Sequence, residues 1–136
     1  MLLAALATAL TAALGCHQAP STEATTAPQS TAIRHVDPAA ARQLLASSQV
    51  LVLDIRTPGE FARGHIAGAT NIDFLAPSFA QRLGGLDRQR EYLVHCATGG
   101  RSTKSLTVFT NLGFRSIAHL DGGFRAWEKA GEPVAK

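Results

Sequence analysis

The sequence predicts an α/β domain with a parallel sheet. From Ile33 onward, short apolar runs alternate with segments of helical pattern, and this alternation is typical of strands joined by helices. Residues 50–53 are apolar without interruption, as in a strand that is covered on both faces. The chain has 136 residues, which is enough for one folded domain but not for two.

Two helix starts flank the strand predicted at residues 50–53. Asp37 followed by Pro38 is typical of an N-cap and a first helical position. Thr57 with Glu60 three residues later predicts a capping box. The second of these helices is expected to be short, because Gly64 follows closely.

The second half of the chain continues the alternation. The pattern predicts three strands there, at residues 69–72, 91–95 and 116–120. It predicts helices at residues 78–83 and at about 102–112, the latter ended by Gly113. A last helix is expected to carry three apolar residues on one face: Phe124, Trp127 and Ala130.

The amino terminus has the pattern of an export signal. Residues 2–14 contain only Leu, Ala and Thr, a run shorter than the roughly 20 apolar residues that cross a bilayer as a helix. Residues 13–16 (Ala-Leu-Gly-Cys) resemble a bacterial lipobox. That resemblance implies a signal peptide at residues 1–15 and a lipidated Cys16, whereas a plain secretory signal cut nearby is the alternative.

The segment at residues 16–31 is predicted to be a disordered tether. It consists mainly of Ala, Ser, Thr, Pro and Gln, which cannot form a core. The folded domain is then expected at residues 32–136, exported to the periplasm or cell envelope and held at the membrane through Cys16. If Cys16 carries lipid, Cys96 is left as a lone free thiol in an oxidising compartment, which favours a chemical role for it.

Residues 95–102 (His-Cys-Ala-Thr-Gly-Gly-Arg-Ser) form the segment with the clearest chemistry. A strand, a glycine-rich turn and a helix are predicted to follow one another here. In such an arrangement the backbone N–H groups of the turn and the positive N-terminal end of the helix converge on one point. Such a site binds anions and favours a thiolate over a thiol. Cys96 is therefore predicted to be a nucleophile.

Three residues are expected at one edge of the sheet, because each comes at the end of a predicted strand: Asp54, Cys96 and Asp121. The carboxyl edge of a parallel sheet is where ligands bind in such folds. The predicted site therefore lies at this edge.

Three segments resemble the motifs of the rhodanese-like single-domain sulfurtransferases. They are residues 53–72, residues 96–102 and residues 120–127. The resemblance extends over about residues 33–134. It implies a three-layer domain with a central, mostly parallel sheet of about five strands flanked by helices.

The same resemblance implies a persulfide cycle that needs no cofactor. Cys96 would take a sulfur atom from a small sulfur-containing anion such as thiosulfate and pass it to a thiol or to cyanide. This is covalent catalysis in two steps. The backbone amides of the loop would hold the charged terminal sulfur, as an oxyanion hole holds oxygen.

The remaining site residues follow from the loop and from the family. The expected substrate-binding residues are Ala97, Thr98, Gly99, Gly100, Arg101 and Ser102. Arg101 is expected to attract anionic donors and to favour the thiolate. Arg56 is a candidate substrate-steering residue, and the resemblance implies that Asp54 forms a structural ion-pair network with it.

Other chemistries receive less support from the sequence. His95 precedes Cys96 in a strand, so its side chain should point to the opposite face and not act as a base. No spacing resembles a metal site, and the scattered basic residues, with a net charge of +3, indicate no nucleic-acid surface.

Two alternative functions stay open. One is a related phosphatase or arsenate reductase, which is disfavoured because the loop between Cys96 and Arg101 is one residue shorter than the loop of those enzymes. The other is a non-enzymatic sulfur carrier, sensor or interaction module.

Overall fold

The computed structural model describes residues 30–136. The predicted signal peptide, Cys16 and all but the last two residues of the predicted tether lie outside the described residues. The first strand begins at Ala32. Within the described part of the chain, no helix has both the length and the apolar character needed to cross a membrane.

Five strands and five helices alternate along the described residues. The strands are β1 (Ala32–Val36), β2 (Val50–Asp54), β3 (Thr70–Asn71), β4 (Glu91–His95) and β5 (Ser116–Leu120). The helices are α1 (Pro38–Leu45), α2 (Pro58–Arg63), α3 (Phe79–Gly84), α4 (Gly100–Asn111) and α5 (Gly123–Lys129).

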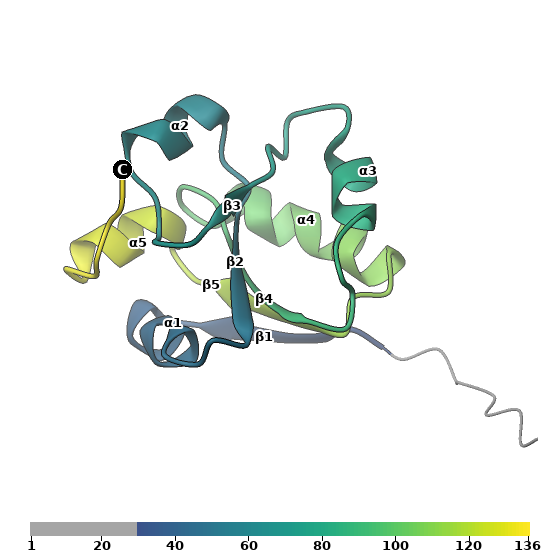
Figure 1. Ribbon diagram of the computed structural model, residues 1–136, viewed down its shortest axis with the longest axis horizontal. Helices are drawn as coiled ribbons and strands as arrows, with labels where there is room; N and C mark the ends of the chain where they lie inside the picture. The colour runs from purple at the N-terminus through teal and green to yellow at the C-terminus, as the bar shows by residue number, and fades with distance from the viewer. Residues whose placement is uncertain (1–29) are drawn as a thin grey trace, which may run out of the picture.

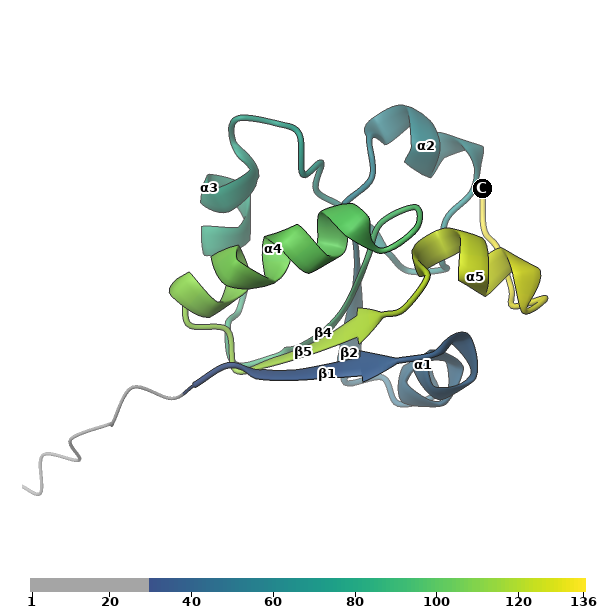
Figure 2. The same cartoon turned by 180° about the vertical axis from the view of Figure 1, so that it is seen from behind.

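The strands form one parallel sheet in the order β1-β5-β4-β2-β3. Helices α1 and α5 lie on one face of the sheet, and α3 and α4 lie on the other (Figures 1 and 2). This is the three-layer α/β fold with a five-stranded central sheet that the family resemblance implied. Because all strands run in one direction, their carboxyl ends share one edge.

Two apolar clusters hold the three layers together, one on each face of the sheet. Alternate residues of each strand point to opposite faces, so Tyr92 and Val94 of β4 join the cluster under α4, whereas Leu93 joins the cluster with Trp127 of α5. Cys96 continues the alternation and belongs to the cluster under α4. The nucleophile candidate is therefore fixed by core packing.

The start signals of α1 and α2 work as predicted. The side chain of Asp37 accepts a hydrogen bond from the Ala40 N–H at 2.7 Å. At α2 both hydrogen bonds of the capping box between Thr57 and Glu60 are present, and Gly64 ends the helix. Both caps satisfy N–H groups that have no partner within a helix.

Several boundaries differ from those predicted. Strand β3 has two residues rather than four, and the Asn71 side chain instead donates to the carbonyls of Asp54 and Arg56. Helix α3 begins and ends one residue later than predicted. Ala130 was expected on the buried face of α5, but it is the exposed C-cap, because the helix ends at Lys129.

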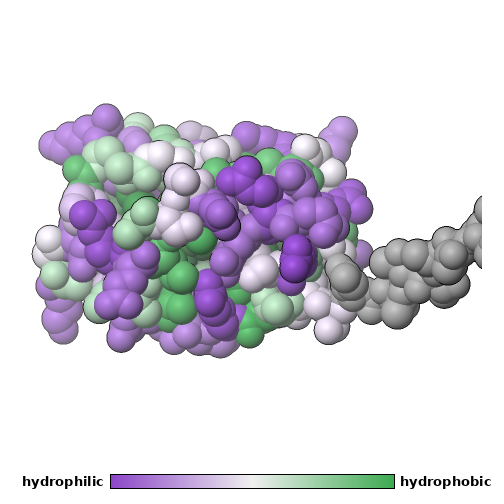
Figure 3. All heavy atoms as spheres, turned by 60° about the horizontal axis from the view of Figure 1, so that its bottom comes forward, coloured by the Kyte–Doolittle hydropathy of each residue, from purple (hydrophilic) through white to green (hydrophobic). Residues whose placement is uncertain are grey.

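The surface mixes polar and apolar residues. On the face drawn in Figure 3, apolar residues occur in small patches separated by hydrophilic ones. Among the described residues, the exposed large apolar side chains are Ile33, Leu51, Leu75 and Val134. Scattered residues of this kind are ordinary for a globular domain.

Candidate active site

Cys96 is the first residue after β4 and lies at the carboxyl edge of the sheet. It is 1% exposed. The Gly99 backbone N–H donates a hydrogen bond to its sulfur at 3.2 Å, and the Ser102 hydroxyl lies 3.5 Å from the sulfur. Two donors from the following turn and helix are thus directed at the thiol.

These donors favour the thiolate form of Cys96. Burial raises the pKa of the thiol, but hydrogen bonds from the Ser102 hydroxyl and from the backbone N–H groups of Ser102, Thr98 and Gly99 outweigh it. The pKa of Cys96 is therefore held below its ordinary value. A lowered pKa of this origin is typical of reactive cysteines.

The turn after Cys96 depends on a left-handed residue at Gly99. Its φ is 103°, a conformation that side chains disfavour, and it is the N-cap of α4. The Thr103 N–H bonds the Gly99 carbonyl at 2.9 Å, so α4 begins at Gly100, two residues before the predicted start. Arg101 and Ser102 therefore lie in the first turn of the helix.

Helix α5 lies beside the loop (Figure 2), and the backbone of its first turn bonds the loop carbonyls. The Phe124 N–H donates to the Cys96 carbonyl at 2.8 Å, and the Arg125 N–H donates to the Ala97 carbonyl at 3.0 Å. A Cβ atom on Gly123 would lie 2.6 Å from the Cys96 carbonyl oxygen. Only glycine permits this approach, which turns the loop carbonyls toward α5.

Arg101 does not point freely into solvent. Its guanidinium forms two hydrogen bonds with the Glu60 carboxylate, at 2.8 and 2.9 Å. The hydrogen bond from Arg101 is the main reason that the pKa of Glu60 falls to about 2. The same contact raises the pKa of Arg101, so both groups stay charged over the physiological range.

Asp54 and Arg56 form the buried ion pair that the family resemblance implied. The two closest atoms, Arg56 Nη2 and Asp54 Oδ2, are 2.6 Å apart, and the side chains are 5% and 0% exposed. Arg56 Nη2 also donates to the Gly64 carbonyl at 2.7 Å. The guanidinium lies 3.9 Å from the centre of the Phe124 ring, a cation–π contact.

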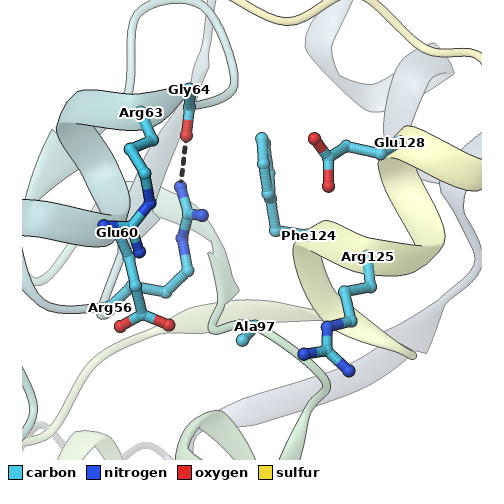
Figure 4. A pocket seen from close by; sticks show the side chains of 8 residues that line it. All are labelled: Arg56, Glu60, Arg63, Gly64, Ala97, Phe124, Arg125 and Glu128. Carbon is cyan, nitrogen blue, oxygen red and sulfur yellow. Dashed lines mark hydrogen bonds between the residues drawn. The ribbon is translucent and has the colours of Figure 1, made fainter.

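A pocket of about 230 Å³ opens beside the loop between α2 and α5. Its lining residues are Arg56, Glu60, Arg63, Gly64, Ala97, Phe124, Arg125 and Glu128. Figure 4 shows Arg56, Glu60 and Arg63 on one side and Phe124, Arg125 and Glu128 on the other. Three guanidinium groups and two carboxylates line the pocket, so positive charge lies close to the loop.

His95 is separated from the sulfur, as predicted. Its Nδ1 lies 3.2 Å from the Cys96 carbonyl oxygen, and its Nε2 lies 3.7 Å from Asp54 Oδ2. The ring is fully buried, and burial lowers the pKa of His95. A neutral ring in this position stabilises the backbone next to Cys96 rather than accepting a proton from its thiol.

His119 was not among the predicted site residues. Its Nε2 lies 2.8 Å from the Ser102 hydroxyl, the group that also contacts Cys96. The two residues meet because β5 packs beneath α4, a contact across 17 residues of sequence. The one signal in the sequence was the position of His119, two residues after Ile117 in an apolar strand. Residues two apart in a strand point to the same face of the sheet, so a histidine there lies on a face that is otherwise apolar.

A family model described as a rhodanese-like domain matches residues 37–130. The chain belongs to the rhodanese-like family. The "Thiosulfate sulfurtransferase 16, chloroplastic" of Arabidopsis thaliana is 35% identical over 92 residues, which are 60% of this chain and 77% of the relative. A "Sulfurtransferase" of Allochromatium vinosum is 31% identical over 104 residues, 75% of this chain and 94% of the relative.

Solved structures agree with the membership in the rhodanese-like family. A rhodanese-related protein from Thermoplasma volcanium superimposes with a TM-score of 0.67 at 29% identity, covering 75% of this chain and 97% of that protein. In sequence, the chain is also similar to the "Thiosulfate sulfurtransferase GlpE" of Pseudomonas aeruginosa, which is 36% identical over 94 residues, 69% of this chain and 83% of the relative. The fold and the sulfurtransferase family are thereby established.

Proposed function

We propose that this chain transfers a sulfane sulfur from thiosulfate or a similar anion to a thiophilic acceptor through a persulfide on Cys96. The observation that carries the proposal is the pair of hydrogen-bond donors, Gly99 N–H and Ser102 Oγ, directed at the sulfur. The thiosulfate sulfurtransferases among its relatives support the same chemistry.

The first half-reaction forms the persulfide. The Cys96 thiolate attacks the outer sulfur of thiosulfate, a new S–S bond forms, and the old S–S bond breaks with its electron pair leaving on sulfite. In the second half-reaction cyanide or a thiolate attacks the terminal sulfur. The bond between that sulfur and Cys96 Sγ breaks, and the thiolate is restored.

The loop supplies electrostatic stabilisation for both steps. The carbonyls of Cys96 and Ala97 accept hydrogen bonds from α5, so the N–H groups of the residues that follow them, Ala97 and Thr98, point away from α5. The Gly99 N–H is directed at the sulfur. The negatively charged terminal sulfur of the persulfide would accept hydrogen bonds from these N–H groups instead of from water. The N–H groups are already in position, so they need not rearrange when negative charge develops on that sulfur.

The pocket between α2 and α5 favours a small dianion as donor. Arg56, Arg63 and Arg125 line it together with Glu60 and Glu128, and Ala97 of the loop belongs to the same lining. The loop offers no cation beyond Arg101 that could bind the carboxylate of a larger donor, which favours thiosulfate over mercaptopyruvate.

Steady-state turnover tests the assignment. The purified chain is expected to form thiocyanate from thiosulfate and cyanide with ping-pong kinetics, and Cys96→Ala is expected to abolish this while retaining the circular dichroism of the wild type. A folded wild type that gives neither thiocyanate nor a sulfur adduct on Cys96 would contradict the enzyme assignment. A stoichiometric adduct without turnover would instead favour a sulfur carrier.

We also propose that the chain is exported and anchored at the cell envelope through Cys16. The apolar run at residues 2–14 and the Ala-Leu-Gly-Cys sequence that ends it support this proposal. Mass spectrometry of the mature protein tests it. A diacylglyceryl group on an amino-terminal Cys16 is the expected result, and a mature chain that begins elsewhere contradicts it.

A further inference from the structure

Three side chains that commonly bind metals meet at the carboxyl ends of β1 and β5, on strands far apart in sequence. They are His35, His119 and Asp121, and one ligand atom from each lies within 4.8 Å of the others. We propose that these residues bind a divalent first-row transition metal ion such as Zn²⁺. This inference goes beyond sulfur transfer and does not depend on it.

The distances between the three atoms fit a shared ion. His35 Nδ1 lies 2.8 Å from Asp121 Oδ1, His119 Nδ1 lies 3.1 Å from the same oxygen, and the two ring nitrogens are 3.2 Å apart. Ligands at the usual Zn–N and Zn–O distances are separated by about 3.3 Å in a tetrahedral site and about 3.0 Å in an octahedral one. Two imidazoles and one carboxylate suit zinc and its neighbours in the first transition row.

Hydrogen bonds alone leave this cluster incompletely satisfied. If both rings carry a proton on Nδ1, both donate to Asp121, but the two N–H groups then face each other at 3.2 Å. If only one ring carries its proton there, the lone pair of the other nitrogen faces the carboxylate oxygen. A cation between the three atoms would accept all three lone pairs at once.

The backbone holds the ligands in place before any ion binds. His35 and His119 are register partners on adjacent parallel strands, so their side chains leave the same face of the sheet. Asp121 is the first residue after β5, and its backbone N–H bonds the Val36 carbonyl at 2.9 Å. Preformed ligands of this kind reduce the entropy lost on binding.

The site is open on one side. The side chains of His35 and Asp121 are 54% and 55% exposed, whereas His119 is 3% exposed. An ion held by three protein atoms could therefore keep water or another small ligand in a further position, as catalytic zinc sites do. Entry does not require the protein to open.

The buried ligand, His119, has the second-shell partner expected of a metal-bound histidine. When Nδ1 binds an ion, the ring proton is on Nε2, which lies 2.8 Å from the Ser102 hydroxyl. That N–H would donate to Ser102, leaving the Ser102 hydrogen for the Gly99 carbonyl or for Cys96. Such partners fix ring orientation and tautomer in metal sites.

Titration with Zn²⁺ and Co²⁺ tests the proposal. The full chain carries Cys16→Ser and Cys96→Ser in every sample, so that neither thiol binds the ion. We expect one equivalent of Zn²⁺ to bind in calorimetry, and expect His35→Ala or Asp121→Asn to weaken binding by roughly tenfold or more. His65→Ala is the matched control, because His65 lies outside the cluster and contacts the Phe61 carbonyl.

A second readout identifies the ligand atoms without relying on substitutions. In ¹⁵N spectra of the histidine rings, Zn²⁺ should shift Nδ1 of His35 and His119 and leave both nitrogens of His65 unchanged. Binding that is absent, that survives both substitutions, or that leaves Nδ1 of His35 and His119 unshifted would overturn the proposal. None of these results bears on thiocyanate formation by the unsubstituted chain, so the two proposals fail separately.

Discussion

Arg101 and Glu60 form a two-pronged ion pair that joins the first turn of α4 to the first turn of α2. The two oxygens of Glu60 receive one guanidinium N–H each, at 2.8 and 2.9 Å. Glu60 Oε2 also accepts from the Thr57 backbone N–H at 3.0 Å. The cation beside the sulfur loop is therefore positioned by the capping residue of a neighbouring helix.

Replacement of Arg101 is expected to affect donor use more than folding. Arg101→Ala removes a cation beside the loop, and kcat/KM for thiosulfate should fall by roughly tenfold or more. The free energy of unfolding should change by less than about 1 kcal/mol, since the pair is partly exposed. Parallel kinetics and urea unfolding measure both quantities.

Glu60→Gln is the companion variant. It removes the negative charge but keeps Arg101, so it should retain donor efficiency or increase it. If Glu60→Gln and Arg101→Ala lose activity and stability to the same extent, Arg101 acts only as a structural partner of Glu60.

Acid stability should depend on Glu60. Arg101 lowers the folded-state pKa of Glu60 from 4.5 to about 2. A lowered carboxyl pKa stabilises the fold above the unfolded-state value, and this contribution disappears as the pH falls from 4.5 toward 2. Over that range the unfolding free energy of the wild type should fall more steeply than that of Glu60→Gln, and equal slopes would contradict this.

Ser102→Ala should make Cys96 less acidic. Its hydroxyl is the largest contribution that lowers the pKa of the thiol, so the pH profile of alkylation by iodoacetamide should shift to higher pH. Ser105→Ala is the control, because the hydroxyl of Ser105 is also buried in α4 but bonds the Ser102 carbonyl. An unchanged profile in Ser102→Ala, or an equal shift in both variants, argues against the hydrogen bond.

Gly123→Ala should destabilise the domain and its loop together. The added Cβ would lie 2.6 Å from the Cys96 carbonyl, at a residue whose φ is +61°, so we expect a loss of about 3 kcal/mol or more. Gly131→Ala is the control, because Gly131 has a similar backbone conformation, with φ of +75°, but no atom lies where its Cβ would be. Its free energy of unfolding should fall by only about 1 to 2 kcal/mol. If urea unfolding gives similar losses for both variants, the clash with the Cys96 carbonyl is not the cause.

Much of the fold could be predicted because its signals are local. Residues 91–95 and 116–120 are strands as predicted, since a short apolar run bounded by turn residues needs no distant partner to be recognised. The Thr57–Glu60 capping box likewise depends on four consecutive residues. The position of Cys96 followed from the strand that precedes it.

The contacts that the sequence did not predict join distant segments. The partnership of Arg101 with Glu60 spans 41 residues, and that of His35 with His119 spans 84. The spacing of residues along the chain gave no indication that His35 and His119 meet, because their contact arises from the pairing of β1 with β5, the first and last strands of the domain. The stacking of Arg56 on Phe124 arises in the same way, from α5 returning to the loop.

The mass of the protein after brief treatment with thiosulfate tests the central claim most directly. We predict that the chain gains the mass of one sulfur atom, that peptide analysis places it on Cys96, and that cyanide removes it as one equivalent of thiocyanate. Cys96→Ala should gain nothing. A folded, fully reduced wild type that stays at its original mass, or a sulfur atom carried only elsewhere, would contradict the account.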